Sequence, residues 1–203
     1  MSNTAKNLDQ FYTHPKISKR FVDKVDEIYD LSSYDHVIEP SMGEGFIYEH
    51  LPAENRVGLD IEKNHYDCLE VDFFEWTPEK SGIEYEPLLG LYPKIIFVGN
   101  PPFGKNSTLA TDFFEHASNF GDDISFIIPK SWSKYSVQNR LPSDFGLYYE
   151  AVLPEYAFIF DGKPYPVRCV AQCWSRFEPK TSYDGPQKEN WEDMDLTYDS
   201  VSV

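Results

Sequence analysis

The residues best suited to chemistry form the segment Asn100-Pro101-Pro102-Phe103, which follows directly on the apolar residues 95–98. Two consecutive prolines remove two backbone donors and stiffen a turn at the end of a strand. The amide of Asn100 comes just before this corner, and the ring of Phe103 completes it. The segment therefore combines a hydrogen-bonding amide and a flat ring on a rigid backbone.

Acidic residues follow three further apolar segments. Glu39 opens the loop EPSMGEG, residues 39–45, whose two glycines let the backbone pass close to a ligand. This loop fits a nucleotide-binding turn and a plain glycine turn equally well, and Tyr48 breaks the G-x-G-x-x-G pattern. Asp60 is placed to accept both hydroxyls of a ribose, with a helix cap or a solvent-facing acid as the alternative. Asp72, taken singly, is better explained as an ordinary acid.

The spacing of apolar residues predicts the elements that must position these side chains. Residues 16–31 and 107–120 have helical spacing, and residues 46–51 are expected to begin another helix. Strands are expected at residues 36–39, 56–61, 68–74, 94–100, 124–129, 147–154 and 166–177. Alternating strands and helices predict an α/β fold with a mostly parallel sheet covered on both faces. Residues 75–93 are expected to be a loop-rich insertion.

Four successive strands of this sheet end in Glu39, Asp60, Asp72 and Asn100. Ligands of open α/β sheets bind outside the carboxyl ends of the strands. We therefore expect the four side chains to border one ligand site.

Composition bounds the protein class. The 203 residues suffice for one domain, and the net charge of −16 argues against an extended basic surface for duplex phosphates. Cys68, Cys169 and Cys173 have no zinc-like spacing and are expected to be buried, reduced thiols, the last two on the same face of a strand. Neither a signal peptide nor a run of about 18 apolar residues is seen, so we expect a soluble intracellular protein with no membrane partner.

With these motifs together, the sequence resembles the class I S-adenosylmethionine-dependent methyltransferases of the adenine-N6 type, which carry Asn-Pro-Pro-Phe. The matching segments are QFYTHP (residues 10–15), EPSMGEG (39–45), Asp60, VDFF (71–74) and GNPPFG (99–104). The resemblance implies a Rossmann-like, seven-stranded sheet, mostly parallel with the last strand antiparallel. It also implies a methyltransferase domain over residues 1–178, without a separate target-recognition domain. Residues 179–203 are acidic and are expected to be a largely disordered tail.

The resemblance implies S-adenosylmethionine as the cofactor, no metal, and methyl transfer to the exocyclic N6 of adenine in nucleic acid, with DNA favoured. The catalytic residues would be Asn100, Pro101, Pro102 and Phe103. Oxygens of Asn100 and Pro101 would accept the two amino hydrogens, and Phe103 would stack on an extruded base. The cofactor-binding residues would be Tyr12, Thr13, Glu39, Pro40, Gly43, Gly45, Asp60, Ile61, Asp72 and Phe73.

Substrate contacts and alternatives stay open at this point. The expected substrate-binding residues are Gly104, Lys105, Lys130 and Trp132. Seven basic residues are candidates for phosphate contacts, with plain solvated surface cations as the alternative: Lys105, Lys130, Lys134, Arg140, Lys16, Lys19 and Arg20. Recognition could be completed by a partner subunit or by a homodimer. The alternative functions are methylation of another exocyclic amine in RNA, methylation of a protein glutamine amide, and a non-catalytic subunit of a methyltransferase complex.

Overall fold

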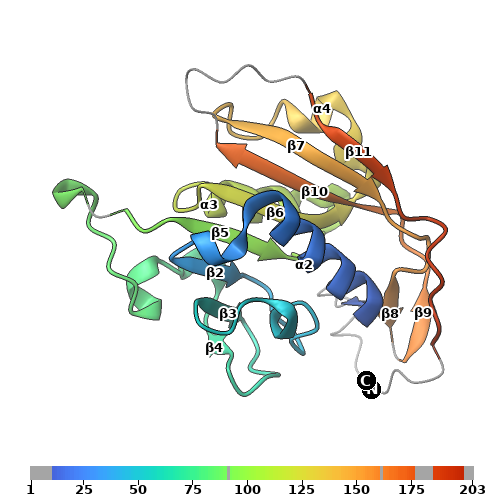
Figure 1. Cartoon of the computed structure of the whole chain (residues 1–203), viewed down its shortest axis with the longest axis horizontal. Helices are drawn as coiled ribbons and strands as arrows, with labels where there is room; N and C mark the ends of the chain where they lie inside the picture. Colours follow the sequence, from blue (N-terminus) through green and yellow to red (C-terminus); the bar gives the residue numbers. More distant parts are fainter. Residues whose placement is uncertain (1–10, 91, 161, 177–184, 199–203) are drawn as a thin grey trace.

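The computed structural model describes residues 11–90, 92–160, 162–176 and 185–198. Eight strands form one sheet in the order β11-β7-β10-β6-β5-β2-β3-β4 (Figure 1). Their bounds are β2 (His36–Glu39), β3 (Arg56–Asp60), β4 (Leu69–Glu70), β5 (Ile95–Gly99), β6 (Asp123–Pro129), β7 (Phe145–Val152), β10 (Cys169–Arg176) and β11 (Gln187–Asn190). A smaller sheet has the order β1-β8-β9, formed by β1 (Tyr12–Thr13), β8 (Phe158–Phe160) and β9 (Lys163–Tyr165).

The large sheet is parallel except at β10. Strands β4, β3, β2, β5 and β6 pair in parallel, β10 pairs antiparallel with β6 and β7, and β11 pairs parallel with β7. A mostly parallel α/β sheet is therefore confirmed, with the last of the seven predicted strands antiparallel. The predicted count of seven is wrong, because β11 adds an eighth strand at the β7 edge.

Helices cover both faces of the sheet. The α-helices are α2 (Pro15–Tyr29), α3 (Thr108–Ala117) and the short α4 (Tyr135–Gln138). Single 3₁₀ turns are η1 (Leu31–Ser33), η2 (Tyr48–His50), η3 (Phe73–Glu75), η4 (Pro78–Ser81), η5 (Pro87–Leu89), η6 (Lys105–Ser107) and η7 (Lys130–Ser133). The insertion that carries η4 and η5 extends away from the sheet (Figure 1).

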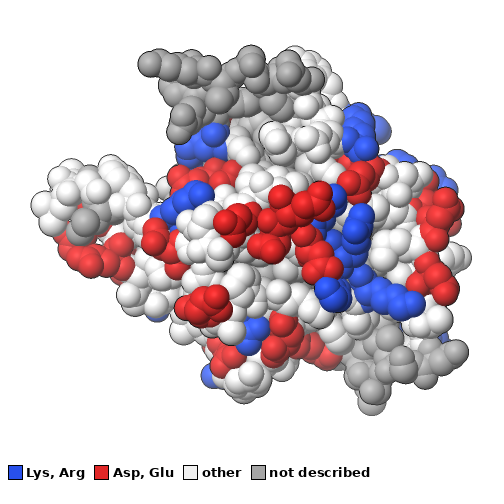
Figure 2. Space-filling view, in the orientation of Figure 1, with Lys and Arg blue, Asp and Glu red and all other residues white. Residues whose placement is uncertain are grey.

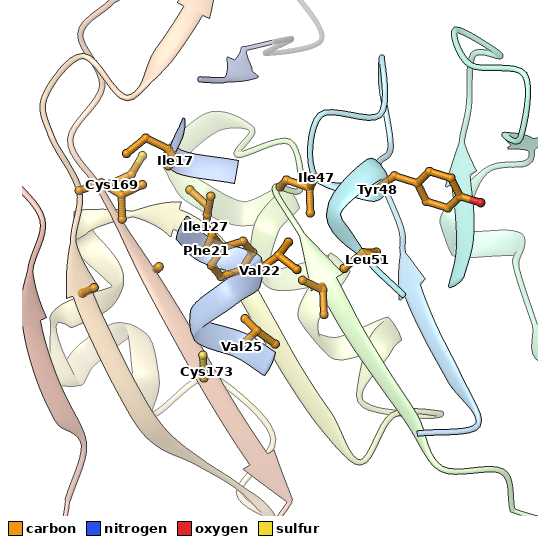
Figure 3. Packing of buried hydrophobic residues seen from close by; sticks show 14 of the residues in the cluster. Ile17, Phe21, Val22, Val25, Ile47, Tyr48, Leu51, Ile127, Cys169 and Cys173 are labelled. Atoms are coloured by element: carbon orange, nitrogen blue, oxygen red, sulfur yellow. The ribbon is translucent and has the colours of Figure 1, made fainter. Parts of the chain in front are cut away.

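Alternating side chains along the strands divide the core into two clusters. On one face, Ile17, Phe21 and Val25 of α2 pack against β5, β6 and β10 (Figure 3). On the other face, Phe114 of α3 packs among side chains of β5 and β6. Cys68, Cys169 and Cys173 are buried free thiols, as predicted, and all three belong to the cluster that contains α2. Burial raises the pKa of the Cys173 thiol to about 12.

Two predicted elements are shorter than expected. Residues 46–51 form only η2, because the chain enters them from a turn at Gly45 and meets Pro52 directly afterwards. Residues 68–74 provide the two-residue β4, because Asp72 accepts a hydrogen bond from the Phe74 amide at 2.9 Å and starts η3. The glycine loop is therefore not followed by a full α-helix. The hairpin β8–β9 has no counterpart among the predicted elements.

The expectation of a largely disordered tail is wrong for residues 185–198. Trp191 is only 4% exposed and belongs to the α2 core cluster, with Met194 and Leu196 packed beside it. Glu189 forms an ion pair with Lys24 of α2 at 2.9 Å. Three apolar residues, at positions 191, 194 and 196, anchor an otherwise polar segment. Residues 179–184 and 199–203 lie outside the described residues, and the domain boundary at 178 stays a prediction.

Candidate active site

A cavity of ≈ 320 Å³ opens at the carboxyl ends of β2, β3 and β5. Most of the residues predicted to act together line it. They are Tyr12, Thr13, Glu39, Pro40, Gly43, Asp60, Ile61, Asp72, Phe73, Asn100, Pro101, Pro102, Phe103 and Gly104. These residues come from five separate segments of the chain, so the fold brings the predicted motifs to one place.

The Asn100 amide is held in a defined orientation. The strand before it, β5, is buried along its whole length. The Nδ2 group of Asn100 donates to the backbone carbonyl of Phe11 at 3.3 Å, and the Ser41 hydroxyl donates to the Asn100 carbonyl at 3.1 Å. Because the Phe11 carbonyl can only accept, the other end of the amide must be the oxygen. That oxygen, Oδ1, is buried and has no hydrogen-bond partner in the structure, although buried acceptors are normally paired.

The corner after Asn100 is closed by tight packing. The ring of Phe103 is 9% exposed and meets Phe158 of β8 edge to face, with ring centroids 6.2 Å apart. Gly104 follows with φ +66, and a Cβ atom there would lie 2.6 Å from Cβ of Leu109. Only glycine allows the chain to turn so closely into α3.

The glycine loop is tied to β3 through a carboxylate. The backbone N–H of Gly43, a residue with φ +54, donates to Oδ2 of Asp60 at 2.8 Å. Oδ1 of Asp60 accepts from the Glu62 amide at 3.0 Å. Each carboxylate oxygen can accept more than one hydrogen bond, so Asp60 keeps acceptor capacity toward the cavity. The loop and the strand end are thereby fixed relative to each other.

Glu39 is a buried carboxyl group on the wall of the cavity. Its side chain is 2% exposed, and its Oε2 atom has no hydrogen-bond partner in the structure. Burial raises the pKa of Glu39 well above its usual value, and the nearby charge of Asp60 adds to this effect. A backbone hydrogen bond from Tyr48 acts in the opposite direction on the same pKa. A buried anion without a partner is costly, so this position suits a ligand that brings a donor or a positive charge.

The aromatic part of the cavity differs from the prediction. Phe73 lines the cavity but lies mostly in the core, stacked on Phe113 with centroids 4.9 Å apart. Its neighbour Phe74 lines the same cavity and is 40% exposed. Phe11 and Phe46 also line it and were missed. Phe11, Phe46 and Phe74 each lie next to a predicted motif residue in the sequence, which is the signal that could have found them.

Four predicted site residues lie outside the cavity lining. Gly45 (φ +87) supports the loop from behind, since a Cβ atom there would lie 2.9 Å from the His65 ring. Lys105 and Lys130 are exposed on η6 and η7. Trp132 is a correction: its side chain is fully buried at 0% exposure, packed against Phe114, and cannot touch a substrate in this conformation. The ring of Trp132 packs in the core beneath α3, and the sequence pattern did not indicate this position.

The cations on α2 are already engaged within the chain. Lys19 pairs with Asp23 at 2.7 Å, and Arg20 pairs with Glu189 at 3.4 Å. The ammonium of Lys16 donates to the carbonyl of Asp195 at 2.9 Å. Basic and acidic side chains lie side by side over this helix (Figure 2). These three residues are therefore weak candidates for phosphate contacts.

Two further classes of site were sought. Within the described ranges, no three His, Cys, Asp or Glu side chains are grouped so that they could hold a metal ion. The helices in the same ranges include none that is long and apolar enough to cross a membrane.

No protein-family model matches the sequence, and no curated protein matches it. Solved structures do match. A Listeria monocytogenes protein assigned as a class I S-adenosylmethionine-dependent methyltransferase aligns over 90% of this chain and 66% of its own, with a TM-score of 0.63 and 9% identity. A Pyrococcus horikoshii protein assigned as an RNA methyltransferase aligns over 83% of this chain and 87% of its own, with a TM-score of 0.58 and 15% identity.

A third match is the modification subunit assigned to a type I restriction enzyme of Vibrio vulnificus. It covers 86% of this chain with a TM-score of 0.52 and 17% identity, while this chain spans 46% of its length. At these identities the likeness establishes the fold. The chain has the fold of the S-adenosylmethionine-dependent methyltransferases, and the cavity lies at the carboxyl edge of its parallel strands.

Proposed function

We propose that this protein is an S-adenosylmethionine-dependent methyltransferase that transfers a methyl group to the exocyclic N6 of adenine in nucleic acid, with DNA favoured. The observation that carries the proposal is the Asn100 amide. Asn100 lines the cavity, its nitrogen is held by the Phe11 carbonyl, and its buried oxygen has no hydrogen-bond partner in the structure. The methyltransferase fold and the Asn-Pro-Pro-Phe segment support the same assignment.

The residues present fit the proposed cofactor. The acidic side chains that line the cavity are Glu39, Asp60 and Asp72, and its described lining includes no Lys or Arg. S-adenosylmethionine is a sulfonium cation with an ammonium group and two ribose hydroxyls, so it offers positive charge and donors to such a lining. Asp60 would accept the ribose hydroxyls, and Glu39 would lie opposite a positive group. Bound there, the cofactor supplies a methyl group that is already activated for transfer.

The protein's own residues would then prepare the acceptor amine. An adenine amino group is a poor nucleophile because its lone pair is delocalised into the ring. Acceptance of its two hydrogens by Asn100 Oδ1 and the Pro101 carbonyl favours a pyramidal nitrogen with a localised lone pair. Because the amide is fixed by Phe11 and the prolines are rigid, little reorganisation is needed in the transition state. No strong general base is required for this chemistry.

The aromatic corner favours a nucleobase over an amide substrate. Phe103 closes the corner beside Asn100, and Phe11, Phe46 and Phe74 add rings around the cavity. Flat rings stack on an extruded base, whereas a glutamine amide offers them little surface. The similar structures include an assigned RNA methyltransferase and a restriction modification subunit, which supports nucleic acid as the substrate class.

The test is methyl transfer by the purified protein and by the variant Asn100→Ala. Tritiated methyl transfer to single-stranded DNA, duplex DNA and RNA, followed by nucleoside mass spectrometry, should detect N6-methyladenine with the wild type. Asn100→Ala should reduce turnover by about 10²–10³-fold, the usual effect of removing one oriented hydrogen-bonding group. Calorimetry should find its affinity for S-adenosylmethionine nearly unchanged.

Asn64 provides a matched control, because this second asparagine also lines the cavity but lies outside the Asn-Pro-Pro-Phe corner. Asn64→Ala should keep most of the turnover. Loss of cofactor binding in Asn100→Ala would contradict the assignment of that residue to the acceptor side. Equal losses of turnover in the two variants would contradict the special role of the corner.

A further inference from the structure

Cations and carboxylates lie on opposite borders of the candidate active site. The side of β2, β3 and β4 carries Glu44, Asp60, Glu62 and Asp72. Burial and the charges of Glu44 and Asp60 raise the pKa of Tyr12. The side of β5, β6 and the β8–β9 hairpin carries exposed Lys105, Lys130, Lys163 and Arg168. A polyanion approaching the cavity is therefore repelled on one side and attracted on the other.

Backbone and side-chain contacts join the segments of Lys105, Lys130 and Arg168, and Lys163 lies on the β8–β9 hairpin that precedes Arg168 in the chain. The amide of Lys130 donates to the carbonyl of Arg168 at 2.9 Å, so these residues are neighbours. The hydroxyls of Ser107 in η6 and Ser131 in η7 lie 3.4 Å apart, which links the turn of Lys105 to the turn of Lys130. Lys163 begins β9 and pairs in register with Phe160 of β8.

These cations are available for a ligand. Within the described residues, no ion pair engages Lys105, Lys130 or Lys163. Arg168 lies 3.7 Å from Glu155, with both side chains exposed. Exposed pairs of this kind contribute little and exchange readily for another anion. The cations of α2, by contrast, are paired within the chain.

Aromatic rings continue from the cavity onto the same border. Phe11 lines the cavity, and its ring stacks on Tyr165 of β9 with centroids 4.7 Å apart and planes at 17°. Phe160 of β8 lies against both rings, at 5.7 Å from each centroid. All three side chains are half-buried, which leaves part of each ring exposed. The Phe11 carbonyl also holds the Asn100 amide, so the ring cluster is directly attached to the reactive corner.

From this arrangement we propose that β1, β8, β9, η6 and η7 form a binding surface for a single strand of nucleic acid, and that this protein acts on unpaired adenine. Strand-binding surfaces combine cations that follow the phosphates with rings on which bases stack. The inference rests on the proposed function and specifies its substrate. A duplex is disfavoured, because its second backbone would be brought toward the carboxylate border and the net charge of −16.

The test measures binding rather than methylation. Fluorescence anisotropy with labelled single-stranded DNA, single-stranded RNA and duplex DNA should give tighter binding of the single strands. For single strands, the logarithm of the binding constant falls by about 0.7 for each tenfold increase in salt concentration and for each phosphate neutralised. Four contacts therefore predict a log–log slope of about −2.8, and loss of two contacts a slope of about −1.4.

The double variant Lys130→Glu/Lys163→Glu should weaken single-strand binding at least about tenfold and flatten the slope. Lys63→Glu is the control, because it makes one charge reversal of the same type on the carboxylate border. It should leave the slope unchanged. Tyr165→Leu, which keeps apolar packing but removes a ring, should weaken binding with no change in slope. Single-stranded DNA and RNA measured side by side show which sugar the surface prefers.

Three results would overturn the inference: duplex DNA bound as tightly as the single strands, an unchanged slope in the double variant, or no binding of any oligonucleotide by the wild type. The proposed function is tested separately by Asn100→Ala. If that variant loses turnover on duplex DNA while the surface variants retain it, the strand-binding surface is wrong and the methyltransferase assignment stands.

Discussion

Replacing Glu39 by glutamine should remove one contribution to the pH dependence of the free energy of unfolding. The carboxyl group is 2% exposed, and one of its oxygens has no partner, so its burial raises its pKa above the ordinary value of 4.5. Above that pH an unfolded Glu39 releases its proton, while the folded protein without ligand retains it. The folded state then binds one more proton, and the free energy of unfolding must fall as pH rises.

One proton difference corresponds to a slope of about −1.4 kcal/mol per pH unit. This contribution begins near pH 4.5 and ends where pH passes the pKa of folded Glu39. Glutamine has the same size, keeps an oxygen for the Tyr48 amide, and carries no proton to release. The free energy of unfolding of Glu39→Gln should therefore exceed that of the wild type by an amount that grows by about 1.4 kcal/mol per pH unit above pH 4.5.

Urea denaturation without added cofactor at a series of pH values between about 4 and 7 measures this difference. Below about pH 4.5 both proteins are neutral at position 39, so the difference there gives the effect of the amide itself and serves as the internal control. A difference that stays constant across the series would refute the reasoning, because it would mean that folded Glu39 titrates like an unfolded glutamate.

Three other outcomes follow from single contacts. Asp60→Ala should weaken cofactor binding by about 1–3 kcal/mol, since it would leave the ribose hydroxyls of the cofactor without their proposed acceptor; an unchanged dissociation constant in calorimetry would remove Asp60 from the site. Gly104→Ala should lower the free energy of unfolding by about 1–3 kcal/mol in urea titrations, because φ is +66 and the new Cβ would crowd Leu109; wild-type stability would speak against this backbone conformation. Trp191→Ala should cost about 3–5 kcal/mol by the same measurement, and a negligible cost would mean that residues 185–198 do not belong to the core in solution.

Regular elements could be predicted where the periodic signal was long. Helix α2 and strands β2, β3, β5, β6, β7 and β10 all overlap predicted segments, because apolar residues recur along them at helical spacing or fill a buried strand. The glycine loop and the proline corner were also visible, since glycine and proline act on their own backbone and need no partner. The convergence of Glu39, Asp60, Asp72 and Asn100 followed from strand order, and all four line the cavity.

Short elements and individual rings could not be predicted in the same way. The three residues of β8 and the three of β9 carry too little pattern to stand out, and only two residues of the strand predicted over residues 68–74 form β4. Trp132 follows a strand end much as a substrate-contacting residue would, yet it fills the core beneath α3. Trp191 lies among acids and looked like part of a disordered tail, but the β7 edge and the surface of α2 were available to receive its segment.

The sequence by itself determined the corner at Asn100, the succession of the parallel strands along the chain and the position of the acids at their ends, because each depends on local backbone preference and apolar periodicity. Only the tertiary structure decided that Phe11 would hold the Asn100 amide, that the Glu39 carboxyl would be left without a partner, and that residues 185–198 would add a strand. These features depend on packing between segments far apart in the chain. The local sequence of a segment does not show which distant surface is left for that segment to pack against.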